Sequence, residues 1–248
     1  MSDDWDFYFC RVDDEPASIF VDLGLARDAP LDDRPHMAYV RVYMRSPRSD
    51  GLSSQEEFDA LVRLENSLTS ALSADHRTTY VGRNTCGGCR DFYFYTDDPN
   101  DWTPRVSKAL GDFSQYDYEA GSHLDSEWKT YFDFLYPSPD DMQRFQNRRV
   151  CETLEQKGDS LSEPREIDHW AYFPDEAGRA NFLRVVGSQG FTVRELSLSE
   201  DRENPFGVRF FRVDVPSFEN IDDVTLPLHR AAIASGGDYD GWETRVVR

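Results

Sequence analysis

The stretch REIDHWAYF, residues 165–173, is typical of a β-strand. The stretch GGDYDGWET, residues 236–244, places two glycines where a helix would stop, followed by residues suited to a strand. Around these stretches the patterns predict helices over 175–188 and 218–235, and strands over 191–198, 207–215 and 242–247. The order strand–helix–strand–strand–helix–strand is typical of the ferredoxin-like α-β plait.

The N-terminal half predicts the same order with added strands at each end. Ser54 and Glu57 fit a capping box at the start of a helix, and an apolar stripe follows at helical spacing: Phe58, Leu61, Val62, Leu68 and Leu72. A weaker helix is expected over 98–110. Strands are expected over 5–12, 17–23, 38–45, 78–83, 90–96, 113–120 and 128–136. The fold class predicted is therefore α+β, with two ferredoxin-like domains that have antiparallel sheets.

The segment YPSPDD, residues 136–141, marks the predicted domain boundary. Its two prolines end one element, and its serine and aspartates suit the start of a helix that runs to Lys157, with Gly158 beyond its end. We therefore expect an N-terminal domain over 1–137 and a C-terminal domain over 138–248.

Several N-terminal strands carry aromatic residues on both faces. Phe92 and Phe94 would face one way and Tyr93 and Tyr95 the other, and the aromatic run 128–136 shows the same pattern. A sheet with one buried face would alternate more cleanly. We therefore expect the second face of this sheet to be covered as well, by the other domain or by a second copy in a homodimer.

The composition limits the class of protein. Acidic residues number 47 against 27 basic ones, a formal net charge of -20, which disfavours direct binding of nucleic acid or anionic membranes and favours a basic protein surface. The sequence contains no apolar run long enough to span a membrane, and its acidic start is not expected to be a signal peptide. Four unevenly spaced cysteines do not suggest a disulfide framework, so a cytoplasmic protein is expected.

Short motifs in the C-terminal half resemble a known family. They are Gly158-Asp159-Ser160 after a helix, Ile167-Asp168-His169 in a strand, and Tyr239-Asp240-Gly241-Trp242 with Thr244 near the end. Over roughly 150–246 this half resembles the bacterial ribonuclease E inhibitors, regulator of ribonuclease activity B. The resemblance implies a small cytoplasmic α+β protein that binds an endoribonuclease and modulates RNA decay without catalysis.

The N-terminal half resembles a bacterial domain family of unknown function over roughly residues 3–136. The resemblance rests on Trp5-Asp6-Phe7-Tyr8, on the run 17–23 and on the hairpin from Gly82-Arg83 to Phe92-Tyr93. It implies no activity.

Cys86-x-x-Cys89 is open to two interpretations. The pair could act in redox chemistry or supply half of a zinc site, yet it flanks a predicted Gly-Gly hairpin rather than a helix start, and no second ligand pair follows. The structural interpretation, a tight turn with small flanking residues, is favoured. No metal or other cofactor is expected.

Asp168 and His169 invite a catalytic interpretation. Neighbouring residues of a strand point to opposite faces, so the carboxylate could not orient the imidazole, and no nucleophile motif accompanies them. On the same strand Trp170 and Tyr172 could stack on bases, although Arg194, Arg209 and Arg212 are too few to make a basic stripe.

The sequence therefore predicts a non-catalytic regulatory protein that binds a protein partner with a basic surface, by resemblance an endoribonuclease of the E type. The alternative is a small hydrolase or metal-dependent enzyme with a site between the domains. The predicted partner-binding residues are Asp168, His169, Asp238, Tyr239, Asp240, Trp242 and Glu243.

Overall fold

The computed structural model describes residues 4–74, 76–199 and 203–247. The chain divides into two compact units, Met1–Pro137 and Ser138–Arg248. Each unit has its own antiparallel sheet. Among the described residues, no helix is both long and apolar enough to cross a membrane.

The first unit is built on a sheet in the order β1-β2-β4-β5-β3-β6. Its strands are β1 (Trp5–Val12), β2 (Glu15–Asp22), β3 (His36–Tyr43), β4 (Thr78–Cys86), β5 (Cys89–Thr96) and β6 (Tyr118–Leu124). A short helix, η1 (Leu23–Arg27), follows β2. The strands β3 to β6 form a plait with two helices, α1 (Gln55–Leu72) and α2 (Trp102–Ala109), and the β1–β2 hairpin extends the sheet beyond β4.

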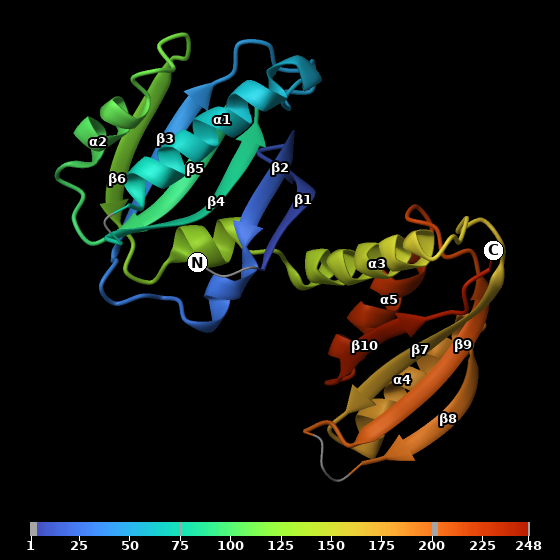
Figure 1. Cartoon of the computed structure of the whole chain (residues 1–248). Helices are drawn as coiled ribbons and strands as arrows, with labels where there is room; N and C mark the ends of the chain where they lie inside the picture. The colour runs from blue at the N-terminus through green and yellow to red at the C-terminus, as the bar shows by residue number, and fades with distance from the viewer. Residues whose placement is uncertain (1–3, 75, 200–202, 248) are drawn as a thin grey trace. The chain divides into compact units, whose positions relative to one another are not determined.

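Helices α1 and α2 cover one face of this sheet (Figure 1). Leu61, Leu64 and Leu68 of α1 are fully buried against Phe92 and Phe94 of β5. Of the predicted stripe, Leu61, Leu68 and Leu72 are buried, Val62 is half-buried and the Phe58 side chain is 43% exposed.

The predicted capping box does not form, although the helix begins where the prediction placed it. Ser54 is the N-cap of α1, but its side chain makes no capping hydrogen bond. Glu57 instead accepts hydrogen bonds from the backbone amides of Arg45 and Ser46, at 2.8 Å each. The carboxylate therefore fixes the loop that precedes the helix rather than the helix end.

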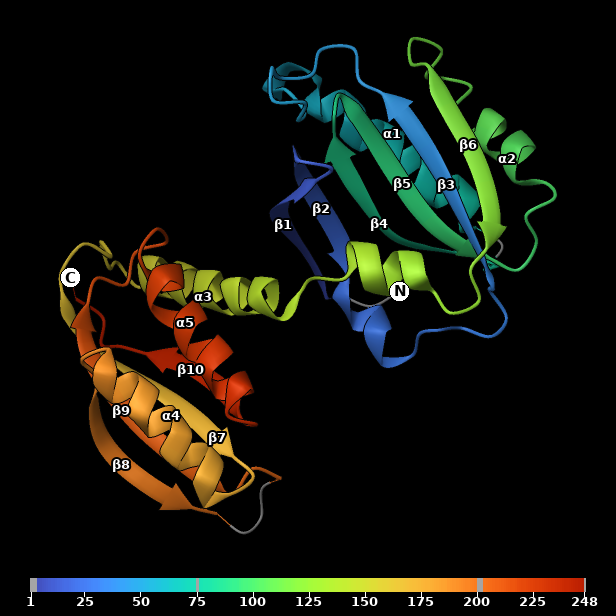
Figure 2. The same cartoon turned by 180° about the vertical axis from the view of Figure 1, so that it is seen from behind.

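The run 128–136 is a helix and not the predicted strand. Its core is a short π-helix, η2 (Thr130–Leu135), which packs on β2 and β4. Trp128 stacks on Tyr95 at 3.9 Å between ring centroids, and Tyr131 is also fully buried. In Figure 2 this yellow-green helix lies in front of the sheet while α1 lies behind it. Part of the second face is thus covered by the domain's own chain, whereas the prediction assigned this role to the other domain or to a second subunit.

The second unit begins with α3 (Pro139–Gln156) and continues with β7 (Arg165–Phe173), α4 (Glu176–Ser188), β8 (Thr192–Leu198), β9 (Phe206–Asp214), α5 (Ile221–Ala234) and β10 (Asp238–Glu243). Its sheet order, β10-β7-β9-β8, is the order of β6-β3-β5-β4 in the first unit. The predicted fold class, two antiparallel α-β plaits, is confirmed.

Three helices of the second unit lie on one side of its sheet. Phe182 of α4 and Leu228 of α5 pack on Phe210 of β9, while Cys151 of α3 joins a smaller cluster with Trp242. Figure 1 shows the sheet with α4 behind it, and Figure 2 shows α4 in front. The face seen in Figure 1 carries no helix.

The last strand starts earlier than predicted. It spans Asp238–Glu243 and contains a bulge between Tyr239 and Gly241, where Gly241 has a φ of 107°. Glycine adopts this backbone conformation without strain, and the extra residue breaks the regular alternation on which the prediction depended.

Candidate functional site

The strand β7 separates the predicted site residues between its two faces. Ile167, His169 and Ala171 are fully buried, whereas Asp168 and Trp170 lie on the opposite, partly exposed face. Asp168 and His169 therefore cannot act as a hydrogen-bonded pair, as the strand geometry predicted.

His169 is a core residue. Its Nδ1 lies 2.7 Å from the Tyr239 hydroxyl oxygen, and its ring stacks on Phe210 and meets Phe191 edge-on. Burial, reinforced by the charge of Arg212, lowers the pKa of His169 to about 3. The imidazole is thus neutral at physiological pH and is shielded from any partner.

Tyr239 and Trp242 are also interior residues. Tyr239 is 3% exposed, and burial raises its pKa well above the ordinary value. The Trp242 Nε1 donates to Asn147 Oδ1 of α3 at 2.9 Å, and Asn147 in turn donates to Thr225 Oγ1 of α5. The prediction that His169, Tyr239 and Trp242 contact a partner is therefore corrected: His169 and Tyr239 join β7 to β10, and Trp242 joins β10 to α3.

The uncovered face of the sheet carries a compact network of charges. Asp168 receives Arg194 Nε at 2.9 Å and Arg209 Nη2 at 3.1 Å. Arg194 also pairs with Glu166 at 2.8 Å. Two arginines thus neutralise two carboxylates, and Asp168 is already occupied by its own domain.

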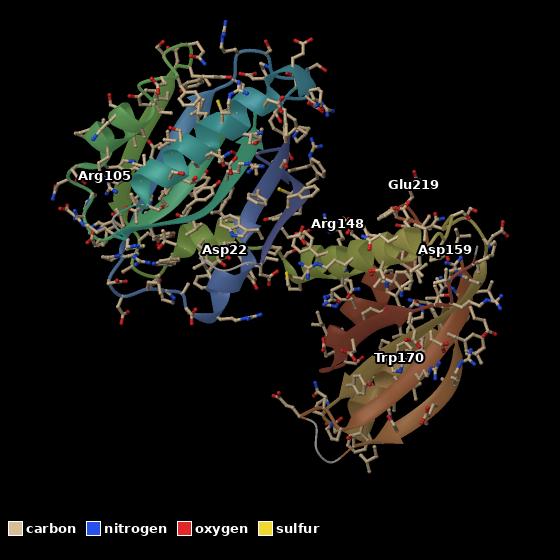
Figure 3. All side chains as sticks on the ribbon, in the orientation of Figure 1. Asp22, Arg105, Arg148, Asp159, Trp170 and Glu219 are labelled. Atoms are coloured by element: carbon tan, nitrogen blue, oxygen red, sulfur yellow. The ribbon has the colours of Figure 1, made fainter. Side chains whose placement is uncertain are left out.

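Aromatic rings lie under the same two arginines. The Arg194 guanidinium is 4.1 Å from the centroid of Phe211, and that of Arg209 is 5.0 Å from the centroid of Trp170, which Figure 3 labels on this sheet. These cation–π contacts and the ion pairs leave little free positive charge to hold a nucleic-acid backbone.

The remaining three predicted residues form an acidic edge. Asp238, Asp240 and Glu243 lie on β10, the outermost strand, and all three are exposed. None of them forms an ion pair with another described residue. Glu243 stands opposite Asp168 in the register and lines a surface hollow of about 770 Å³ together with Glu166, Asp168, Thr244 and Arg245. We call the three β10 residues Asp238, Asp240 and Glu243 the acidic edge.

Sequence reasoning missed the pairing of Arg194 and Arg209 with the acids of β7. Arg209 stands opposite Trp170 in the register, but Arg194 sits in a bulge of β8 between Val193 and Glu195. The polar–apolar alternation gives no signal for such a bulge.

Cys86 and Cys89 face each other across the β4–β5 turn as free thiols. Burial raises the pKa of both, with Glu15 adding to the effect at Cys86 and Asp91 at Cys89. A raised pKa reduces the thiolate fraction that redox chemistry and metal binding require. Across residues 4–74, 76–199 and 203–247, no three His, Cys, Asp or Glu side chains are grouped as a metal site requires.

Comparison with known families assigns the N-terminal half of the chain to a family. Residues 3–136 match the model of a family of unknown function, DUF695. The chain belongs to this family. Residues 144–244 match a second family model, regulator of ribonuclease activity B. Both resemblances expected from the sequence motifs are confirmed, each over the expected half.

Other comparisons add little. No curated protein matches the chain. A crystal structure of an unknown protein from Galdieria sulphuraria is 16% identical, over 86% of this chain and 99% of that one, with a TM-score of 0.24. A putative glycine cleavage system transcriptional repressor is 10% identical, over 85% of this chain and 98% of that one, with a TM-score of 0.27. At these TM-scores neither likeness bears on fold or function.

Proposed function

We propose that this protein is a non-catalytic regulator that binds a ribonuclease through the acidic edge of its second unit and thereby changes the rate of RNA decay. The match of residues 144–244 to the regulator of ribonuclease activity B carries the proposal. By the same resemblance the partner is an endoribonuclease of the E type, and the protein acts in the cytoplasm.

The acidic edge supports a basic partner surface. Its three carboxylates are exposed and unpaired among the described residues, whereas Asp168 and Glu166 are held by Arg194 and Arg209. With a net charge of -20, the whole chain adds a long-range attraction to a cationic surface. Such charges raise the association rate and make binding sensitive to salt.

The surroundings of His169 do not favour the alternative function, an enzyme that uses this imidazole. His169 is neutral and enclosed by Phe191, Phe210 and Tyr239, so the imidazole cannot reach a substrate. Direct RNA binding on Trp170 is disfavoured because the adjacent arginines are neutralised by Glu166 and Asp168.

Charge reversal tests the proposal. We expect the triple variant Asp238→Lys, Asp240→Lys, Glu243→Lys to weaken binding to purified ribonuclease E by at least about tenfold at low salt, because each removed attraction becomes a repulsion. The matched control reverses three exposed loop acids of the first unit, Asp32, Asp112 and Asp117. Equal affinities for the two triple variants, measured by biolayer interferometry at two salt concentrations, would exclude the acidic edge as the binding site.

A further inference from the structure

The first unit contains a cavity of about 400 Å³ that no family description explains. Its floor is formed by β1, β2, β4 and β5, and consists of two rows of residues that are paired from strand to strand. The first row is Phe9, Ser18, Thr85 and Arg90, and the second begins with Phe7, Phe20 and Arg83. Phe58 of α1 and the loop residues before that helix form the walls.

The charge of this cavity is opposite to that of the whole chain. Its lining includes three arginines, Arg48, Arg83 and Arg90, and no carboxylate. Arg83 is held by Glu65 at 2.6 Å and lies over the Phe20 ring at 4.5 Å. Arg48 pairs with Asp50 at 2.6 Å. In a chain with 47 acidic residues, a lining that holds only cationic charge favours an anionic ligand.

Arg90 is the unsatisfied member of the three. It is 2% exposed; its Nε donates to Thr85 Oγ1 at 3.1 Å and its Nη2 to Ser53 Oγ at 3.2 Å. Its Nη1 is buried without a hydrogen-bond partner, and the Glu65 Oε2 atom lies 3.9 Å away. Burial lowers the pKa of Arg90 to about 10, so the group is cationic at neutral pH. A buried guanidinium N–H without an acceptor is costly, and a ligand oxygen would remove that cost.

Four phenylalanines also line the cavity. Phe7, Phe9 and Phe58 are 43%, 65% and 43% exposed, and they gather with Phe20 around the same hollow. Large apolar side chains rarely cluster in contact with water unless they bind something. Apolar walls with a few polar groups at one place are typical of small-molecule sites, and the volume is within their range.

We propose that this cavity binds a small organic anion that carries an aromatic ring. Its carboxylate or phosphate group accepts hydrogen bonds from Arg90 and from the Ser53 hydroxyl, while its ring packs on the phenylalanine side chains. The site is independent of the acidic edge and of the ribonuclease proposal.

Matched probes test the proposal on the full chain by NMR titration, which detects millimolar binding. The probes are 3-phenylpropionate and phenyl phosphate, against 3-phenylpropanol, which lacks the charge, and acetate and inorganic phosphate, which lack the ring. We expect at least one aromatic anion to bind at least about tenfold more tightly than the alcohol and the ring-free anions, because charge and ring contribute together. The Arg90 Nε–H signal, assigned with the Arg90→Lys variant, should shift on binding.

A pair of variants keeps the test independent of folding. Phe58→Ala removes an exposed wall of the cavity, and Phe218→Ala removes a side chain of nearly equal exposure, 42%, from the second unit. We expect only Phe58→Ala to weaken binding of the aromatic anion, severalfold. The proposal is overturned by equal affinity for phenylpropanol and phenylpropionate, by no shift with any probe, or by equal affinities of the two variants.

Discussion

The two sheets of this protein have the same strand order but different surroundings. In the first unit, α1 and α2 cover one face and η2 packs on β2 and β4 at the other, where Trp128 is stacked on Tyr95. In the second unit, three helices share one face and the other bears ion pairs over aromatic rings. The same strand order can therefore bury residues on both faces of a sheet or leave one face for charged groups. The outcome depends on whether the additional helix packs on the second face, as η2 does, or beside the other helices, as α3 does.

The largest loss of stability should come from the buried residues between η2 and the sheet of the first unit. Trp128→Ala is expected to lower the free energy of unfolding by about 3–5 kcal/mol, since it empties a fully buried site and loses the hydrogen bond from Nε1 to the Arg34 carbonyl. Urea unfolding of the full chain gives the change, and hydrogen exchange of the β5 amides assigns it to the first unit.

Trp170→Ala is the matched change on the uncovered face. It removes the same side-chain type but only a partly exposed ring beneath Arg209, so the loss should be about 1 kcal/mol. Equal losses for the two tryptophans would show that the two faces do not differ as described.

His169, on the buried face of β7, should make the stability of the fold depend on pH. His169 has a folded pKa of about 3, below the ordinary value of about 6.5 that the unfolded chain shows. The unfolded state therefore binds an extra proton between these values, and stability is lost as the pH falls from about 6.5 toward about 3.

Replacing His169 by phenylalanine isolates that contribution. The unfolding free energy of the wild type should fall more steeply than that of His169→Phe, by about 1.4 kcal/mol per pH unit below pH 6, with no difference in slope above pH 7. Urea unfolding at pH 5, 6, 7 and 8 measures the two slopes. Parallel curves throughout would mean that His169 has the same pKa in the folded and unfolded protein.

The smallest effect is expected from the charge network of the uncovered face. Arg194→Ala breaks the ion pairs of Arg194 with Glu166 and Asp168. Because these side chains are partly exposed to water, the variant should lose no more than about 1 kcal/mol of unfolding free energy, and less in high salt. A loss of several kcal/mol in urea unfolding, unchanged by salt, would instead place this network in a dry interface.

The sequence predicted most elements because their patterns are local. Residues 165–173 form β7 over the predicted bounds, and Asp175 caps α4 by accepting the Gly178 amide at 2.8 Å. The family resemblances likewise rest on local motifs.

The errors occurred where periodicity was ambiguous or where partners were distant in sequence. The run 128–136 has an aromatic or apolar residue at so many positions that the helical spacing of the buried Trp128, Tyr131 and Leu135 was hidden. For the candidate site, the exposure of Asp238 and Asp240 follows the alternation of β10, whereas Glu243 is exposed beyond the bulge of that strand. The pairing of Asp168 with Arg194 likewise depends on a bulge, in β8, that the alternation does not predict.

The central claim is that the protein regulates a ribonuclease without cutting RNA itself. The most direct measurement follows cleavage of a labelled RNA by purified ribonuclease E, with increasing amounts of the full chain, beside the full chain alone. The proposal predicts intact RNA with the protein alone and a dose-dependent change in the ribonuclease rate, which the acidic-edge triple variant weakens. RNA cleavage by the protein alone, or a ribonuclease rate that does not respond to it, would contradict the claim.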